Sequence, residues 1–331
     1  MTRVVVIGSG FGARVAAPAW RAAGAEVVDV RSARALDVDR VITAARPDVV
    51  SVHSPPFLHA GHVEAAVTAG AIVLCDKPTT PAAPMTQALI GRLGASAERV
   101  YVNFEFRFEP ARVELRRLMR SAAIGAITRI TWIHHSNGSI EPLRPFGWLF
   151  DASLGGGWIG AWASHAIDAL HSWLDEPLSV QTSEPRIDVP VRFDGDGMPR
   201  EVTAEDGLVA ELRTPSGVRI LLDSTFASSD PSPPTIIVEG TDGTITNIAD
   251  RRLVIDSDSE GPRSWNRTAG RSADRHDAPM RALATALLGS VRRGEGVASD
   301  HSALETTPLP TLADGLRVDR VLDELRVGRA H

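Results

Sequence analysis

Near its start the chain reads Val4-Val5-Val6-Ile7-Gly8-Ser9-Gly10-Phe11-Gly12-Ala13-Arg14. The run of β-branched residues predicts a strand that is buried on both faces. The G-x-G-x-x-A pattern after it is typical of a turn into a helix that binds the pyrophosphate of a dinucleotide. In this interpretation Gly8 permits the tight turn, Gly10 lets the backbone approach the phosphates, and Ala13 is the third small position, where helix and strand pack. A glycine-rich turn without a ligand is the alternative, and the alternating strand and helix patterns up to Val102 favour the nucleotide site.

Length and composition narrow the class of protein. A chain of 331 residues suggests two domains, and an apolar content of 43% suffices for ordinary cores. The net charge of -6 argues against a nucleic-acid-binding protein. No apolar run has the length of a membrane span, and the run that ends at Gly8 is too short for a signal peptide, so we expect a cytoplasmic protein. The single cysteine, Cys75, excludes an intrachain disulfide and a cysteine-rich zinc site, and no metal is expected.

The end of the second predicted strand indicates the coenzyme. An NAD-binding site usually carries an acidic residue about 20 positions after the glycines. That position is Ser32, and Arg31 and Arg34 flank it. Guanidinium groups suit a 2′-phosphate, so the sequence favours NADP(H) over NAD(H). The alternative is a solvent-exposed arginine pair, and Asp29, the nearest acid, lies within the strand.

Lys77 is the strongest candidate for chemistry, and it is the only lysine in the chain. It follows the predicted strand 71–74 in the segment Cys75-Asp76-Lys77-Pro78, whose last peptide bond is a candidate for the cis form. Ligands of open α/β sheets bind at the carboxyl ends of the strands, where the loop Ser54-Pro55-Pro56 is also expected. A partly desolvated lysine there can bind a substrate oxygen and assist its proton transfer. A solvated loop charge is the alternative.

The second half of the chain has a different pattern. Strands are predicted between 208 and 255, a surface excursion at 185–201, a polar loop at 256–277 and helices at 280–292 and 310–326. Gly155-Gly156-Gly157 leads into a predicted helix, 158–174, on which His165 and Asp168 share one face. His165 can exchange a proton near neutral pH, although a structural histidine is the alternative. Trp158 and Trp162 offer indole faces for a sugar ring, or pack in the core.

With these residues assembled, the chain resembles the glucose–fructose oxidoreductase and inositol dehydrogenase (Gfo/Idh/MocA) family. The resemblance rests on the glycine motif and on several short segments, namely Ser54-Pro55-Pro56-Phe57-Leu58-His59, Asp76-Lys77-Pro78, Phe106-Arg107-Phe108-Glu109-Pro110, Gly155-Gly156-Gly157, Ser164-His165-Ala166-Ile167-Asp168 and Ala313-Asp314-Gly315-Leu316-Arg317-Val318. It implies an α/β protein with an N-terminal Rossmann domain, expected at 1–107. It also implies a C-terminal α/β domain with a large open, mostly antiparallel sheet, expected at 108–331. Association through that sheet implies a homodimer or homotetramer.

The resemblance also implies roles for individual residues. Lys77 and His165 align with the catalytic lysine and histidine of the family. The positions expected to bind substrate are Asp168, Glu105, Arg107, Trp158 and Trp162. The positions expected to bind the coenzyme are Gly8, Gly10, Phe11, Gly12, Ala13, Arg31, Ser32, Arg34, Ser54, Pro55, Pro56, His59, Asp76 and Lys77. The chain departs from the family's usual residues at Asp76, usually glutamate, and at Glu105, usually asparagine. It departs also at Ala161, where many members carry aspartate, which leaves the acid–base work to His165 and Lys77, with Glu105 as a further candidate.

The leading prediction is an NADP(H)-dependent oxidoreductase. It would transfer a hydride between the nicotinamide and a sugar, cyclitol or related carbonyl or hydroxyl compound. Two alternatives stay open because function depends on the site and not on the fold. One is other redox chemistry on the same scaffold, either imine reduction or NAD-assisted glycoside cleavage. The other is a nucleotide-sensing regulator without turnover.

Overall fold

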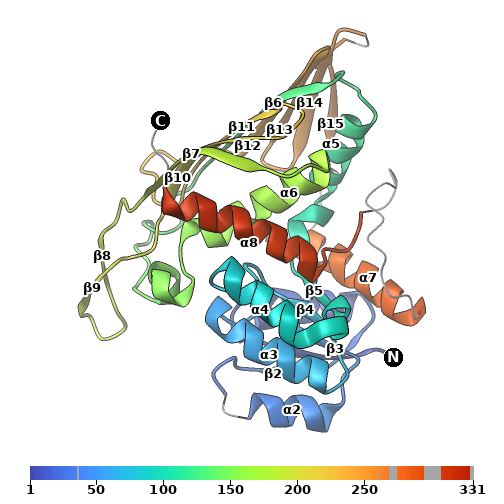
Figure 1. The fold of residues 1–331 in the computed structure, drawn as a ribbon, viewed down its shortest axis with the longest axis vertical. Helices are drawn as coiled ribbons and strands as arrows, with labels where there is room; N and C mark the ends of the chain where they lie inside the picture. Colours follow the sequence, from blue (N-terminus) through green and yellow to red (C-terminus); the bar gives the residue numbers. More distant parts are fainter. Residues whose placement is uncertain (36, 260, 268–273, 294–306, 329–331) are drawn as a thin grey trace. The chain divides into compact units, whose positions relative to one another are not determined.

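The computed structural model describes the chain except for residues 36, 260, 268–273, 294–306 and 329–331. The chain forms two compact units (Figure 1). The first unit consists of Met1–Glu109 and Gly270–Asp319, and the second of Pro110–Ala269 and Arg320–His331. Among the described residues, no helix combines the length and the apolar character that crossing a bilayer requires.

The first unit contains a parallel five-stranded sheet in the order β2-β1-β3-β4-β5. Its strands are β1 (Arg3–Ile7), β2 (Glu26–Arg31), β3 (Val49–Val52), β4 (Ile72–Cys75) and β5 (Val100–Val102). The helices between them are α1 (Ala17–Ala22), α2 (Val38–Ala45), α3 (Pro56–Thr68) and α4 (Ala83–Leu93), with the 3-10 turns η2 (Gly94–Arg99) and η3 (Glu105–Phe108). Val4–Ile7 is fully buried, as the apolar run predicts, and the order of the strands confirms the Rossmann architecture.

The helix after the glycine motif is divided into two segments. Gly12–Ala16 forms a π-helical turn, η1, and α1 follows with Pro18 in its first turn. Ala16 and Ala17 both have helical dihedral angles, so the backbone stays helical through the junction, and Pro18, which lacks an N–H, lies just after the π-helical turn. The sequence predicts one helix from Gly10 to Ala23 in which Pro18 causes a kink or marks a short first segment, and the structure has the short first segment.

Helix α7 (Asp277–Arg293) packs in the first unit, although the sequence assigns all of 108–331 to the second domain. Its apolar side chains Met280, Leu283 and Leu287 are fully buried in the same core cluster as Trp20 of α1. These residues recur at helical spacing and form one face. The C-terminal part of the chain is therefore shared between the two units, because this face is buried against α1.

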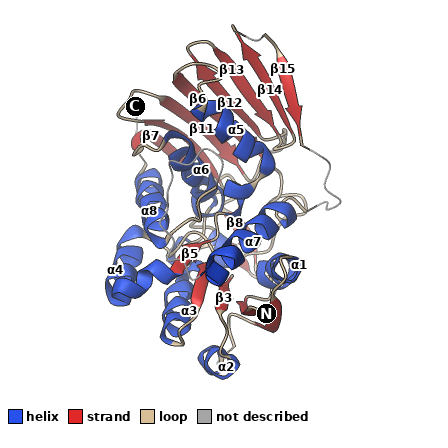
Figure 2. Ribbon diagram, turned by 90° about the vertical axis from the view of Figure 1, so that its right-hand side faces the viewer, coloured by secondary structure: helices blue, strands red, loops and turns tan. Residues whose placement is uncertain are grey.

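The second unit contains an eight-stranded sheet in the order β15-β14-β13-β12-β6-β11-β10-β7. The strands are β6 (Ile127–His135), β7 (Ser179–Arg186), β10 (Gly207–Arg213), β11 (Arg219–Thr225), β12 (Thr235–Gly240), β13 (Gly243–Ile248), β14 (Arg252–Ser257) and β15 (Arg263–Asn266). Every pair is antiparallel except β6 with β11, which confirms a large, mostly antiparallel sheet. Helices α5 (Pro110–Arg120) and α6 (Ser164–Leu174) cover one face (Figure 2), and α8 (Leu312–Val327) ends in this unit.

Two segments without expected strands contain strands. The predicted excursion 185–201 holds β8 (Val191–Phe193) and β9 (Pro199–Glu201), which pair as a small hairpin. The predicted loop 256–277 holds β15, which pairs with β14 at the edge of the large sheet. An edge strand needs no apolar face, so its polar sequence gave no strand signal. The rest of that predicted loop includes 268–273, which lies outside the described residues. The remaining short turns are η4 (Trp148–Phe150), η5 (Ala152–Leu154) and η6 (Ile159–Ala163).

Candidate functional site

The glycine motif presents an open backbone after β1. Gly8 has a φ of +134°, and a Cβ there would lie 2.5 Å from the His53 carbonyl oxygen, so no other residue fits. At Gly10 a Cβ would meet no atom within 4 Å, which leaves the backbone accessible for the close approach of a pyrophosphate. These residues therefore fit a dinucleotide. Gly12 also packs closely, since a Cβ there would lie 3.1 Å from Val6, and Ala13, the predicted third small position, is partly buried.

The end of β2 carries an acid as well as the predicted cations. Asp29 and Arg31 lie on the same side of the strand, and an Arg31 guanidinium nitrogen lies 2.7 Å from Asp29 Oδ2. A second contact joins Arg31 to Asp37 at 3.9 Å. The Arg34 backbone N–H donates to the Ser32 hydroxyl oxygen over 3.4 Å. Although Asp29 lies within the strand, its side chain reaches Arg31 and therefore belongs to the group of charged residues at the end of β2.

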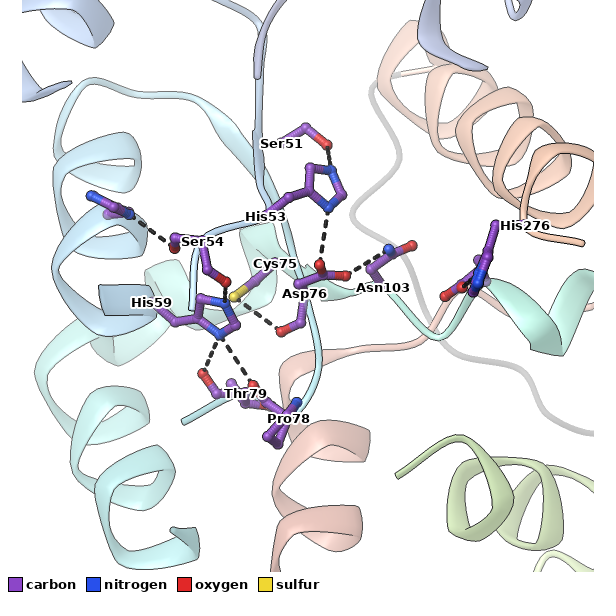
Figure 3. A network of polar contacts seen from close by, with 12 residues as sticks. Ser51, His53, Ser54, His59, Cys75, Asp76, Pro78, Thr79, Asn103 and His276 are labelled. Carbon is purple, nitrogen blue, oxygen red and sulfur yellow. Dashed lines mark hydrogen bonds and ion pairs between the residues drawn. The ribbon is translucent and has the colours of Figure 1, made fainter. Parts of the chain in front are cut away.

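A series of polar contacts leads to Asp76 at the carboxyl ends of β3 and β4 (Figure 3). The Trp20 indole N–H donates to Ser51 Oγ over 2.9 Å, and Ser51 Oγ lies 2.7 Å from His53 Nε2. His53 Nδ1 lies 3.3 Å from Asp76 Oδ2, and Asn103 donates to Asp76 Oδ1 over 2.8 Å. Because an indole only donates, the Ser51 proton is available to His53, whose own proton then faces Asp76. Ser51 is fully buried, so this series of residues positions Asp76 and offers no exposed nucleophile.

The charge state of Asp76 follows from this environment. Burial alone would raise its pKa, but His53, Lys77 and Asn103 stabilise the carboxylate, and the net pKa lies below the usual value. For Lys77, in contrast, the effect of burial on the pKa outweighs the effect of the neighbouring carboxylates. Burial lowers the pKa of Lys77 most, Asp76 and Glu105 act to raise it, Arg275 lowers it, and the net direction is down. The sequence thus places beside an ionised carboxylate an amine that releases its proton more readily than an ordinary lysine.

His59 has a different position from the one expected of a coenzyme ligand. It is fully buried, with Nε2 2.7 Å from the Ser54 carbonyl oxygen and Nδ1 3.1 Å from those of Pro78 and Thr79 (Figure 3). Burial lowers the pKa of His59, which opposes the effect of Asp76 and of these carbonyl groups. His59 therefore connects the loop after β3 to the loop after β4, where the Lys77–Pro78 peptide bond is cis as expected.

Glu105 and Arg107 lie in the turn η3, which follows β5. Glu105 is 2% exposed, and its Oε1 lies 2.7 Å from His276 Nδ1. Arg107 is buried, donates to the Pro308 carbonyl oxygen over 3.4 Å and lies 3.7 Å from Asp314. Its guanidinium is therefore engaged within the first unit. His276 was missed by the sequence analysis, because nothing in a polar segment so distant along the chain indicates contact with Glu105.

In the second unit the predicted tryptophans belong to a buried aromatic cluster. Trp158 stacks on Phe226 with ring centroids 4.4 Å apart and donates from its indole N–H to Ser224 over 2.8 Å. Trp162 stacks on Trp158 at 6.4 Å and meets Trp132 edge to face at 5.8 Å. Trp158 and Trp162 are 7% and 6% exposed, so core packing accounts for most of their surface.

His165 and Asp168 both lie on α6, as predicted, and are 8% and 2% exposed. The helix start before them is fixed by a residue that the sequence did not indicate. Glu205 accepts from the Ile159 backbone N–H over 3.0 Å, at the beginning of η6. Burial raises the pKa of Glu205, while its hydrogen bonds and Arg326 oppose the rise. A carboxylate at this end compensates the free N–H groups of the helix.

The comparisons with known proteins agree with this architecture. Residues 2–104 match the model of the oxidoreductase family with an NAD-binding Rossmann fold, and residues 113–246 match that of the GFO/IDH/MocA C-terminal domain. An uncharacterized oxidoreductase of Synechocystis is 29% identical over 244 residues, which cover 67% of this chain and 65% of that protein. Levoglucosan dehydrogenase of Pseudarthrobacter phenanthrenivorans is 26% identical over 221 residues, which cover 62% and 56%. The chain thus spans less than two thirds of the length of these relatives.

A solved structure extends the likeness to the fold of nearly the whole chain. Levoglucosan dehydrogenase in complex with NADH and L-sorbose has a TM-score of 0.84 at 20% identity, covering 99% of this chain and 96% of that one. The family models together match the whole parallel sheet and most of the large sheet, and the glycine motif, Lys77 and α6 lie within the matched ranges. The chain therefore belongs to the GFO/IDH/MocA family of oxidoreductases.

Proposed function

We propose that this protein is an NAD(P)(H)-dependent oxidoreductase that interconverts a hydroxyl and a carbonyl group on a sugar, cyclitol or related compound. The observation that supports this most is Lys77, a partly buried amine with a lowered pKa beside an ionised Asp76, at the carboxyl end of the Rossmann sheet. When bound, the nicotinamide coenzyme supplies the hydride donor or acceptor. The open backbone at Gly10 suits its pyrophosphate.

Lys77 is proposed to bind the substrate oxygen and to exchange its proton. A neutral amine takes the hydroxyl proton during oxidation, and the ammonium returns it during reduction. His165 is proposed as a second proton-transfer group, with Asp168 one helical turn after it and Trp158 and Trp162 on the same stretch of chain as substrate contacts. The sugar-like substrate class is supported by the named levoglucosan dehydrogenase relative.

The preference for NADP(H) over NAD(H) is also a proposal. Arg31 is held by Asp29, so Arg34 and Ser32 are the groups proposed to contact the 2′-phosphate. Loss of a charged contact to a phosphate costs about 1.5–3 kcal/mol, so Arg34→Ala weakens NADPH binding by about 10- to 100-fold and leaves NADH binding nearly unchanged. Dissociation constants measured by calorimetry test this. Equal affinity of the wild type for both coenzymes would contradict it.

A panel of sugars, anhydrosugars and cyclitols tests the proposed activity. Each compound is incubated with either coenzyme, and coenzyme oxidation or reduction is followed by absorbance. The proposal predicts turnover with at least one compound, which Lys77→Met removes. Coenzyme binding without turnover on any compound would instead support the nucleotide-sensing alternative. If an aryl glycoside is added to the panel, release of its aglycone with no net coenzyme change would support NAD-assisted glycoside cleavage.

A further inference from the structure

We propose that Glu105, held in place by His276, is a positioning residue for Lys77: its buried carboxylate keeps the lysine in the ammonium form that gives a proton to the substrate oxygen. This inference rests on the proposed function for its role in the reaction, although the arrangement itself can be tested without turnover. It concerns a pair of residues that come together from opposite parts of the sequence, at η3 and at the start of α7.

The contact between the two residues is short and protected. Glu105 is 2% exposed, and its Oε1 lies 2.7 Å from His276 Nδ1. The Arg275 Nε–H points to His276 Nε2 over 3.4 Å, which suits a ring that carries its proton on Nδ1 and donates it to Glu105. Asp274 accepts from the His276 backbone N–H over 2.9 Å, which fixes the segment that begins α7.

Aromatic packing holds the imidazole ring. Phe106 lies 4.9 Å from His276 between ring centroids, and Phe11 meets it edge to face at 5.3 Å. Phe11 follows Gly10 in the glycine motif, and its ring also lies 5.3 Å from that of His53. Phe11 therefore contacts both histidines, one paired with Glu105 and the other next to Asp76.

Sheet topology brings Glu105 close to Lys77. Strands β4 and β5 are paired, with Cys75 opposite Val102, so their carboxyl ends lie side by side. The contact of Asn103 with Asp76 at 2.8 Å joins the two segments just beyond the strands. Lys77 follows Asp76, and Glu105 follows Asn103 by two positions. Lys77 therefore lies at an edge that carries two carboxylates acting on it, Asp76 beside His53 and Glu105 beside His276.

The charged groups that act on Lys77 come from three segments. Asp76 is its neighbour after β4, Glu105 lies in η3 and Arg275 precedes α7. Both carboxylates stabilise the ammonium form of Lys77, and Arg275 and burial oppose it, so the pKa of Lys77 depends on whether Glu105 is present and ionised. Removing the charge of Glu105 must then shift the Lys77 pKa further down.

The single lysine of the chain allows a direct test. Protein labelled with 13C at lysine Cε gives one lysine signal, whose pH titration reports Lys77 alone. Glu105→Gln is expected to lower the titration midpoint by about one pH unit, since an opposite charge nearby shifts a pKa by about that much or more. His276→Ala is expected to move it in the same direction, and His276→Asn, which keeps an N–H near the Nδ1 position, restores most of the shift. Glu114→Gln, which removes a carboxylate paired with Arg117 on α5, is the matched control and leaves the midpoint unchanged.

A midpoint that is the same in the wild type and in Glu105→Gln would overturn the proposal. If Glu105→Gln shifts the titration midpoint of Lys77 and His276→Ala does not, the role proposed for His276 is overturned. Once a substrate is known, the pH dependence of kcat in Glu105→Gln is expected to shift in the same direction as the titration midpoint of Lys77, while the KM for the coenzyme stays the same. If no compound is turned over, the proposed function fails while the titration still decides this inference.

Discussion

At the scale of single residues, Lys77 combines partial burial, which favours the neutral amine, with two nearby carboxylates, which both favour the ammonium form. Desolvation destabilises the ammonium and the carboxylates stabilise it. Because the net pKa is lowered, the neutral amine is more accessible at Lys77 than at a surface lysine. The lone lysine after a buried strand was visible in the sequence. The residues that set its charge were only partly visible, because Asp76 is adjacent but Glu105 and Arg275 reach it through the fold.

The role of Lys77 leads to a prediction on activity. Lys77→Met removes the proton-transfer group while keeping a side chain of similar length, so kcat falls by about 10²- to 10⁴-fold and coenzyme affinity changes little. His165→Ala is expected to lower kcat by the same order. Steady-state kinetics across the pH range measure both effects. Wild-type kcat in His165→Ala would make His165 structural and leave the acid–base role to Lys77 with Glu105.

At the scale of elements, two glycines of the turn after β1 have different roles: Gly8 is needed for folding, and Gly10 is proposed to be needed for coenzyme binding. Gly8→Ala forces a left-handed φ of +134° on alanine and places its Cβ 2.5 Å from the His53 carbonyl oxygen. The strain and the overlap destabilise the protein by about 2–5 kcal/mol. Gly10→Ala meets no atom within 4 Å, so the coenzyme-free protein keeps its stability.

Gly10→Ala is expected to affect coenzyme binding instead of stability. Gly10→Ala places a methyl group where the phosphates approach, which weakens coenzyme binding by about tenfold or more, or ~1.4 kcal/mol. Thermal unfolding and calorimetric titration of both variants test this assignment. Unchanged coenzyme affinity in Gly10→Ala would show that the backbone at Gly10 does not approach a ligand.

Elements with a strong apolar pattern were predictable, and those defined by tertiary contact were not. The buried run Val4–Ile7 and the strand before Lys77 follow from local sequence alone. β15 was missed because an edge strand can be polar on both faces. Strand alternation places Asp29 and Arg31 on the same side of β2, but only the structure shows that the two side chains form an ion pair at the expected coenzyme site. His276 gave no signal, because only the packing of α7 brings it to Glu105.

At the scale of the whole molecule, the large sheet supports a proposal of self-association. One cross-strand row on the face opposite α5 and α6 consists of Val254, Thr246, Ile237, Thr131 and Leu221, all of them partly exposed. An apolar and threonine-rich row at the middle of a wide sheet suits a second copy of the same surface, as in an isologous dimer.

Disruption of that row tests the self-association. The wild type is expected to be a dimer or tetramer by light scattering at micromolar concentration, and Ile237→Arg is expected to lower the mass toward the monomer by burying unpaired charge. Ala95→Arg, on an exposed turn of the first unit, is the control that leaves the mass unchanged. A monomeric wild type would count against the proposal, as would an Ile237→Arg variant with the wild-type mass.

The most direct test of the proposed activity follows the hydride itself. Reduced coenzyme carrying deuterium at C4 of the nicotinamide is incubated with the carbonyl form of a substrate from the panel, and the product is analysed by mass spectrometry. The proposed function predicts one deuterium on the carbon that becomes a carbinol, transferred by the wild type and about 10²- to 10⁴-fold more slowly by Lys77→Met. With both C4 hydrogens of the coenzyme replaced by deuterium, so that either face transfers the label, a product without deuterium, or transfer at the wild-type rate by Lys77→Met, would contradict it.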